Sequence, residues 1–210
     1  MCLQNRYLPA NVRAKELCAD NLTTGGFCSV VWSRDADYYR QSDWRGRFAT
    51  EGGGVLINQA IHTLDLLTWF MGAPRSVTAD VYNYHLKDVI DVEDTAQGYI
   101  EFDNASALFY ATTAAAENFP VEIALVGKRK IRLLADALFV DGEKVPLTQS
   151  PLGNVKPYWG AGHAAIITDF YNSLISGSPF AVDENEGAKS VELVLSIYES
   201  HGKRIAFGGR

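Results

Sequence analysis

The stretch EGGGVLINQAIHTLDLLTWF, residues 51–70, decides most of what the sequence indicates about this chain. Three glycines precede a segment with enough apolar residues to surround a helix on most of its sides. The polar residues, in contrast to the apolar ones, lie on one side of this helix. At about 100° per residue, Asn58, His62, Asp65 and Trp69 fall within an arc of roughly 60°. The sequence therefore predicts a buried helix over Asn58–Met71 that carries one polar row.

Three interpretations of this row fit the residue types. In the first, it is an internal hydrogen-bond network in which Asp65 fixes the His62 imidazole and Asn58 caps the helix. In the second, His62 and Asp65 belong to a metal site, although no third ligand follows nearby. In the third, the row is an active-site wall where His62 shuttles a proton and Asn58 holds a substrate hydroxyl. The glycines favour the third, since they permit close backbone approach to a ligand, but they also suit tight packing.

Composition and charge exclude several classes of function. The chain has 210 residues, of which 47% are hydrophobic and 21% charged, so it can bury a core without disulfides or metals. A net charge of −6 argues against a nucleic-acid or anionic-membrane partner. No apolar run reaches the ~18 residues of a membrane span, and the first residues lack a signal-peptide layout. With three cysteines and no C-x-x-C spacing, we expect a cytoplasmic protein without bound metal.

The patterns on either side of the central stretch predict an α+β fold, an open and mainly antiparallel sheet with helices packed on one face. No linker or repeat divides the chain, so residues 1–210 are expected to form a single domain. The short β-rich runs after residue 75 are separated by turns of hairpin type. The other expected elements are a helix over Pro9–Asp20, a strand within 26–35, a long loop over 36–54, and two helices over Gly162–Gly177 and Glu184–Lys203.

Several motifs together resemble the C-terminal portion of the Gfo/Idh/MocA oxidoreductases, and they occur in the family's order over nearly the whole chain. The resemblance implies a part of an NAD(P)-dependent enzyme that oxidises a secondary alcohol of a sugar, cyclitol or polyol. It also implies a homo-oligomer that associates through the sheet. The motifs are NRYLPAN…KEL, W.RD…YY…WRG, EGGGVLINQAIHTLDLL, GHAAIITDFY and EGAKSVELVLSIYES.

The resemblance assigns a role to each candidate residue. His62 matches the family's catalytic histidine, which exchanges the proton of the hydroxyl being oxidised. Asn58 matches a position that is aspartate in inositol-dehydrogenase-like members. Because an amide cannot take up a proton at neutral pH, Asn58 is expected to orient substrate. Asp65 is expected to support the helix or the imidazole, and the other matches to substrate-binding positions are Arg6, Trp44, Arg45 and His163.

The family's dinucleotide-binding domain, with its G-x-G-x-x-G turn, has no counterpart in this sequence. The E-K-P segment, whose lysine assists hydride transfer in the family, is also missing. We therefore expect the substrate half of a two-domain enzyme, with no cofactor-binding residues of its own. By itself it should bind neither NAD nor NADP and turn over no sugar. The alternative is a non-catalytic module that oligomerises through its sheet or binds sugar without redox chemistry.

Overall fold

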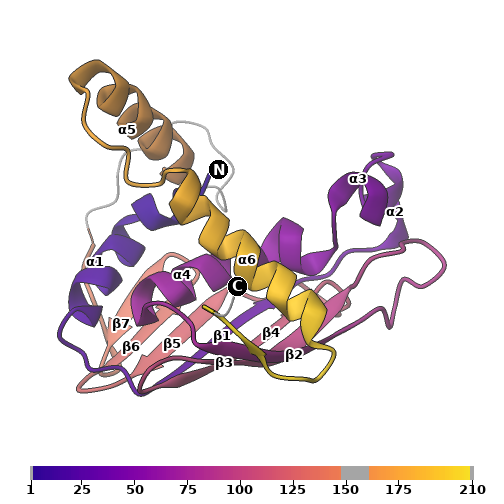
Figure 1. Cartoon of the computed structure of the whole chain (residues 1–210), viewed down its shortest axis with the longest axis horizontal. Coiled ribbons are helices and arrows are strands. Elements are labelled where there is room, and N and C mark those ends of the chain that lie inside the picture. Colours follow the sequence, from indigo (N-terminus) through magenta and orange to yellow (C-terminus); the bar gives the residue numbers. More distant parts are fainter. Residues whose placement is uncertain (1, 148–160, 209–210) are drawn as a thin grey trace.

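The computed structural model describes residues 2–147 and 161–208. These residues build an open nine-stranded sheet in the order β8-β7-β6-β5-β1-β4-β3-β2-β9, with helices over one face (Figure 1). The expected α+β class is confirmed. The strands are β1 (Gly25–Val31), β2 (Ser76–Tyr82), β3 (Thr95–Glu101), β4 (Ser106–Thr112), β5 (Glu122–Val126), β6 (Lys130–Leu134), β7 (Ala137–Val140), β8 (Glu143–Lys144) and β9 (Ile205–Ala206).

One pair of neighbouring strands in this sheet is parallel and the other pairs are antiparallel. β1 lies between β4, its parallel neighbour, and β5, so Phe27 is opposite both Leu108 and Ala124. Residues along β1 alternate between the two faces of the sheet, as the sequence pattern predicts. Cys28 and Val30 are buried under the helices, whereas Phe27 is exposed on the opposite face.

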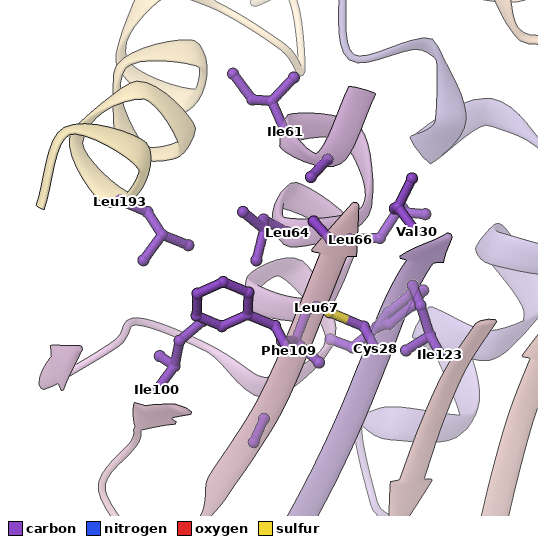
Figure 2. Close-up of a cluster of buried hydrophobic side chains, with 14 of the residues drawn as sticks. Cys28, Val30, Ile61, Leu64, Leu66, Leu67, Ile100, Phe109, Ile123 and Leu193 are labelled. Atoms are coloured by element: carbon purple, nitrogen blue, oxygen red, sulfur yellow. The ribbon is translucent and has the colours of Figure 1, made fainter. Parts of the chain in front are cut away.

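The helical layer is centred on α4, which crosses the middle of the sheet. Its side chains Leu64 and Leu67 are fully buried and lie over Cys28 and Phe109 (Figure 2). Burying one such leucine contributes about 1.5–3 kcal/mol to stability. The helices are η1 (Gln4–Tyr7), α1 (Pro9–Cys18), α2 (Ala36–Arg40), α3 (Phe48–Glu51), η2 (Leu56–Ala60), α4 (Ile61–Met71), α5 (Gly162–Ser176) and α6 (Glu184–Ser200).

The central helix begins earlier than the sequence pattern predicts, and with a different geometry. Its first turn, η2, is π-helical, and the backbone N–H of Ile61 donates to the carbonyl of Leu56, five residues before it. The spacing of 100° per residue does not hold across such a turn. The polar row is therefore irregular at its N-terminal end. π-helical turns inside helices are frequent at functional sites.

The expectation of an unbroken loop over 36–54 is wrong, because the short helices α2 and α3 lie within it. Asp35 caps α2, since its carboxylate accepts a hydrogen bond from the backbone N–H of Tyr38 at 2.9 Å. Tyr39 anchors the segment in a small second core with Leu86, Ile90 and Val92. Helices this short depend on such tertiary contacts, which local sequence patterns do not reveal.

Helix α5 lies outside the layer that covers the sheet (Figure 1). It packs against η1 through a small apolar cluster of Leu3, Ile166 and Val182. The hydroxyl of Tyr7 donates to the carboxylate of Asp169 at 2.6 Å, which adds a polar link between the two helices. In residues 2–147 and 161–208, no helix has both the length and the apolar character that a membrane crossing requires.

Candidate active site

The glycine triplet that begins the site is packed against a buried carboxylate. Glu93 accepts hydrogen bonds from the backbone N–H groups of Gly54 and Leu56, each at 2.9 Å, and from the hydroxyl of Tyr198 at 2.8 Å. A Cβ atom on Gly54 would lie 1.9 Å from the Glu93 carbonyl oxygen, and one on Gly53 would lie 2.1 Å from the Tyr198 hydroxyl. The glycines therefore permit close packing at the start of η2, where a protein carboxylate already occupies these amides.

His62 lies in the first turn of α4 and is half-buried. Its Nδ1 atom is buried and has no hydrogen-bond partner in the part of the chain that the structure describes. Burial lowers the pKa of His62 below its ordinary value of 6.5; the charge of Asp65 opposes this shift, and His163 adds to it. The imidazole is therefore neutral at pH 7, which is the state in which it can accept a proton.

Asp65 belongs to a buried ion-pair network that joins three helices. Arg6 donates to both carboxylate oxygens of Asp65, from Nε at 2.9 Å and from Nη2 at 2.7 Å. Ser190 in α6 donates to the same carboxylate at 2.7 Å, and Arg6 also pairs with Glu186 in α6 at 2.9 Å. These bonds support helix α4. None of the hydrogen bonds within the described residues joins Asp65 to His62, so Asp65 acts on the imidazole through its charge.

Arg6 is less available to a substrate than its sequence match implies. It is 9% exposed, and three of its five N–H donors are used by the carboxylates of Asp65 and Glu186. Its guanidinium also lies 5.5 Å from the ring centre of Trp69. Asp65 and Trp69 therefore face Arg6 together, as their predicted spacing on the helix requires. A role for Arg6 in substrate binding stays a prediction.

Asn58 faces the loop that precedes the glycines. Its amide nitrogen donates to the carboxylate of Glu51, and its amide oxygen accepts from Gln59 at 3.2 Å. The other oxygen of Glu51 accepts from the backbone N–H of Gly46 at 2.5 Å. The idea that Asn58 caps the helix is wrong, because the helix begins two residues before it. The sequence analysis did not identify Glu51 and Glu93 as residues of the site, because the tertiary fold determines which groups they bind.

Trp44 and Arg45 lie between α2 and α3, on the segment that Glu51 links to Asn58. Trp44 is 47% exposed, while Arg45 is half-buried. The Arg45 guanidinium lies 5.3 Å from the Trp44 ring centre and 4.6 Å from that of Tyr38. His163, the remaining candidate, lies in the first turn of α5, close enough to His62 for the two imidazoles to interact electrostatically.

Two hollows on the described surface lie away from these residues. One runs along α6 between Glu184 and Ser196, and the other lies between α1 and the β7–β8 hairpin. Neither is lined by His62 or Asn58. Among residues 2–147 and 161–208, no three His, Cys, Asp or Glu side chains gather in an arrangement that could hold a metal ion.

Comparison with protein families assigns the chain. The family model of the GFO/IDH/MocA C-terminal domain matches residues 24–131, which is half of the chain and includes β1, the central helix and the strands β2 to β5. The chain belongs to this family. Membership agrees with the motifs around the glycine triplet and His62. No curated protein matches the chain significantly by sequence.

Solved structures share the fold of this Gfo/Idh/MocA chain. The WlbA dehydrogenase from Bordetella pertussis, crystallised with NADH and UDP-GlcNAcA, matches with a TM-score of 0.82 at 23% identity, over 99% of this chain and 64% of its own. A levoglucosan dehydrogenase in complex with NADH matches with a TM-score of 0.84 at 18% identity, over 98% of this chain and 64% of its own.

An oxidoreductase from Agrobacterium radiobacter has the same fold. It was crystallised with NAD+, L-tartaric acid and magnesium, and it matches with a TM-score of 0.80 at 20% identity, over 98% of this chain and 64% of its own. The chain thus spans less than two thirds of the length of these structures.

Proposed function

We propose that this chain is the substrate-binding part of an NAD(P)-dependent oxidoreductase that acts on a secondary alcohol of a sugar, cyclitol or polyol. The observation that carries the proposal is the imidazole of His62, which is neutral and half-buried and has no partner for Nδ1 within the described residues. Family membership supports the same reaction class. The substrates of the similar structures, which include a sugar nucleotide and an anhydrosugar, are compatible with it.

His62 is the proton acceptor in this proposal. Oxidation of a secondary alcohol removes a hydride and a proton, and a base with a pKa near the working pH is suited to take the proton. The buried network of Arg6, Asp65 and Ser190 fixes the helix that carries His62. Asn58, held on both sides of its amide, orients a substrate hydroxyl through its remaining N–H and oxygen lone pair.

The residues of this chain do not fit a dinucleotide. Its sequence has no G-x-G-x-x-G turn between a strand and a helix. At the start of η2, where glycines precede a helix, the amides of Gly54 and Leu56 are bonded to Glu93. We infer that NAD or NADP is held by a dinucleotide-binding domain outside the described residues, and that this domain forms the active-site cleft together with the surface around His62. The chain alone is then expected to be inactive.

Reconstitution tests this function. The chain should be fused to, or mixed with, a dinucleotide-binding domain of the family, and reduction of NAD+ and NADP+ should be followed with a panel of sugars, cyclitols and polyols. We expect turnover of at least one substrate in the assembled enzyme and none by either part alone. If the assembled enzyme folds and binds NADH but oxidises no member of the panel, the proposal is contradicted.

A second function, which is compatible with the first, is homo-oligomerisation through the open face of the sheet. The register places Phe27, Leu108 and Tyr99 side by side on β1, β4 and β3, on the face opposite the helices. They are 37%, 60% and 39% exposed, and Tyr110 and Val126 extend the patch. Apolar patches of this kind mark association surfaces. We infer that a second copy of the chain covers this face.

A further inference from the structure

We propose that Arg34 and Arg45, both stacked on the ring of Tyr38, bind the anionic group of an acidic sugar substrate, either a carboxylate or a phosphate. The proposal rests on the function proposed above and specifies its substrate class. Trp32 and Trp44 complete the group, which we call the arginine–aromatic stack and define as Trp32, Arg34, Tyr38, Arg45 and Trp44.

No carboxylate within the described residues neutralises the charges of Arg34 and Arg45. In residues 2–147 and 161–208, every other arginine lies within 4.0 Å of a carboxylate oxygen. Arg34 and Arg45 form no such pair there, and the stretches 148–160 and 209–210 contain no aspartate or glutamate. The chain as a whole has 25 acidic and 19 basic residues. Two guanidinium groups that lack an acidic partner in the described residues and contact one ring are therefore unusual in this protein.

The two arginines contact the same aromatic ring. The guanidinium carbons of Arg34 and Arg45 lie 5.0 Å and 4.6 Å from the ring centre of Tyr38. Arg34 is also 5.0 Å from the Trp32 ring centre. Cation–π contacts of this length stabilise the charged side chains and favour one orientation for them. Two cations that share one ring without a counter-ion repel each other, and an anion bound at the guanidinium groups would reduce that repulsion.

Most donors of the two guanidinium groups remain unused. Arg34 donates from Nη1 to the Ser33 carbonyl at 2.7 Å and to the Asn118 side chain at 3.0 Å. Arg45 makes one long bond, to the Tyr38 carbonyl at 3.4 Å. The Nε atom of each is buried without a partner in the described part of the chain. Guanidinium groups with free donors match the paired oxygens of carboxylates and phosphates.

Nearby carboxylates are committed to other partners. Asp35 accepts from the backbone of Tyr38, where it caps α2. Asp37 pairs with Arg40 at 3.1 Å, on the exposed side of α2. Neither forms an ion pair with Arg34 or Arg45 in the described residues, so these two carboxylates do not neutralise the guanidinium groups.

The stack is rigidly placed beside the candidate active site. Gly46, the residue after Arg45, is buried, and a Cβ atom there would lie 2.3 Å from the Ile90 side chain. The Gly46 carbonyl accepts from the backbone of Asp91 at 3.0 Å, and its N–H donates to Glu51. Glu51 in turn accepts from Asn58. The Glu51 side chain thus connects the segment of the stack to Asn58, the residue assigned to substrate hydroxyls. The proposal places the anionic group of the ligand at the stack and one of its hydroxyls at Asn58.

A titration of the chain with small sugars tests the proposal. The ¹⁵N-labelled chain should be titrated at low ionic strength with sodium D-glucuronate, D-glucose 6-phosphate and D-glucose, with sodium chloride at matched ionic strength as the reference. The Trp44 indole and arginine Nε–H signals report binding. We expect one or both acidic sugars to bind at least tenfold more tightly than glucose, with affinity falling as salt rises. The stronger acidic sugar identifies carboxylate or phosphate as the preferred group.

Matched variants make the result specific. R34Q and R45Q should each reduce the preference for the acidic sugar to less than threefold, whereas R40Q, an exposed arginine on the same segment, should leave it unchanged. R34K and R45K keep the charge but lose the planar fork, and they should give intermediate preferences if a glutamine variant misfolds. Equal affinity for glucose, signals that respond only as they do to sodium chloride, or a preference that survives in R34Q and R45Q would overturn the proposal. If the reconstituted enzyme oxidises neutral polyols only, this inference fails while the proposed function stands.

Discussion

Arg6 donates two hydrogen bonds to the carboxylate of Asp65, from Nε to Oδ2 at 2.9 Å and from Nη2 to Oδ1 at 2.7 Å, although the two residues are 59 positions apart. The side chains are 8% and 1% exposed, so the pair is sealed from water. Ser190 and Glu186 extend it to α6. The pair therefore joins η1, α4 and α6 one helical turn from His62, and it stabilises the position of α4.

Breaking this pair from one side should strongly destabilise the fold. Arg6→Met leaves the buried Asp65 carboxylate without a counter-charge, and Asp65→Asn leaves Arg6 with Glu186 as its remaining carboxylate partner. Breaking a buried pair from one side costs about 3–5 kcal/mol. The double variant Arg6→Met/Asp65→Leu removes both charges and should lose less than either single change. Urea unfolding followed by circular dichroism measures this. Glu16→Gln, in the exposed pair with Arg13, is the control and should change stability by less than about 0.5 kcal/mol. If the variants at Arg6 and Asp65 changed the free energy of unfolding as little as Glu16→Gln does, the stabilising role of the buried pair would be contradicted.

Gly54→Ala should damage the start of the central helix. The added Cβ would lie 1.9 Å from the Glu93 carbonyl oxygen, so the backbone of η2 must shift, and overpacking of this kind costs about 1–3 kcal/mol. Gly25→Ala is the matched control, because no atom lies within 4 Å of a Cβ placed there. Thermal melts of both variants give the comparison. A Gly54→Ala variant as stable as Gly25→Ala would show that the triplet is not needed for packing.

The pKa of His62 should be below 6.5 in the folded chain, because burial favours the neutral imidazole and outweighs the charge of Asp65. The unfolded chain then binds the proton more readily. The contribution of His62 to stability is therefore fully present above pH 6.5 and declines as the pH falls from 6.5 through the folded pKa. His62→Gln should reduce this acid sensitivity. An NMR titration of the imidazole tests the direction, and a pKa of 6.5 or above would contradict it.

The open face of the sheet should carry the contact between copies. Leu108→Lys places a charge in the middle of the exposed apolar row of β4 and should shift the chain toward monomer. Leu174→Lys on α5 is the control, because Leu174 is 62% exposed and Leu108 60%. Light scattering at tens of micromolar measures both. A wild-type chain that is monomeric at that concentration, or a Leu108→Lys oligomer equal to wild type, would contradict the inference.

The sequence predicts the layers of this fold well because their signals are local. Alternation marks β1, hairpin turns mark the strands that follow it, and an apolar run marks α4. Helix α2 was not predictable because it depends on the core around Tyr39, which forms only when residues 86–92 fold against it. Helix α3 likewise depends on a distant residue, since the backbone N–H of Phe48 donates to the carboxylate of Asp91 at 2.6 Å. The π-helical turn at Leu56 also lies outside any fixed period.

Several residues of the candidate site could be predicted from the sequence, but the hydrogen bonds and ion pairs between them could not. Sequence spacing correctly brings Asp65 and Trp69 to one side of the helix, where both meet Arg6. The spacing could not show that the Asp65 carboxylate binds Arg6 and Ser190 and makes no hydrogen bond to His62 within the described residues, because Arg6 and Ser190 come from distant parts of the chain. Glu51 and Glu93 were missed for the same reason. A carboxylate in a sequence does not reveal which amide it will meet.

The most direct test of the central claim is the turnover number of His62→Ala in the reconstituted enzyme. If His62 accepts the substrate proton, kcat should fall by about 10²–10⁴-fold, while binding of NADH and the melting temperature stay close to wild type. His85→Ala, an exposed histidine elsewhere in the chain, should keep full activity. A His62→Ala enzyme that folds and turns over within a few-fold of wild type would contradict the account.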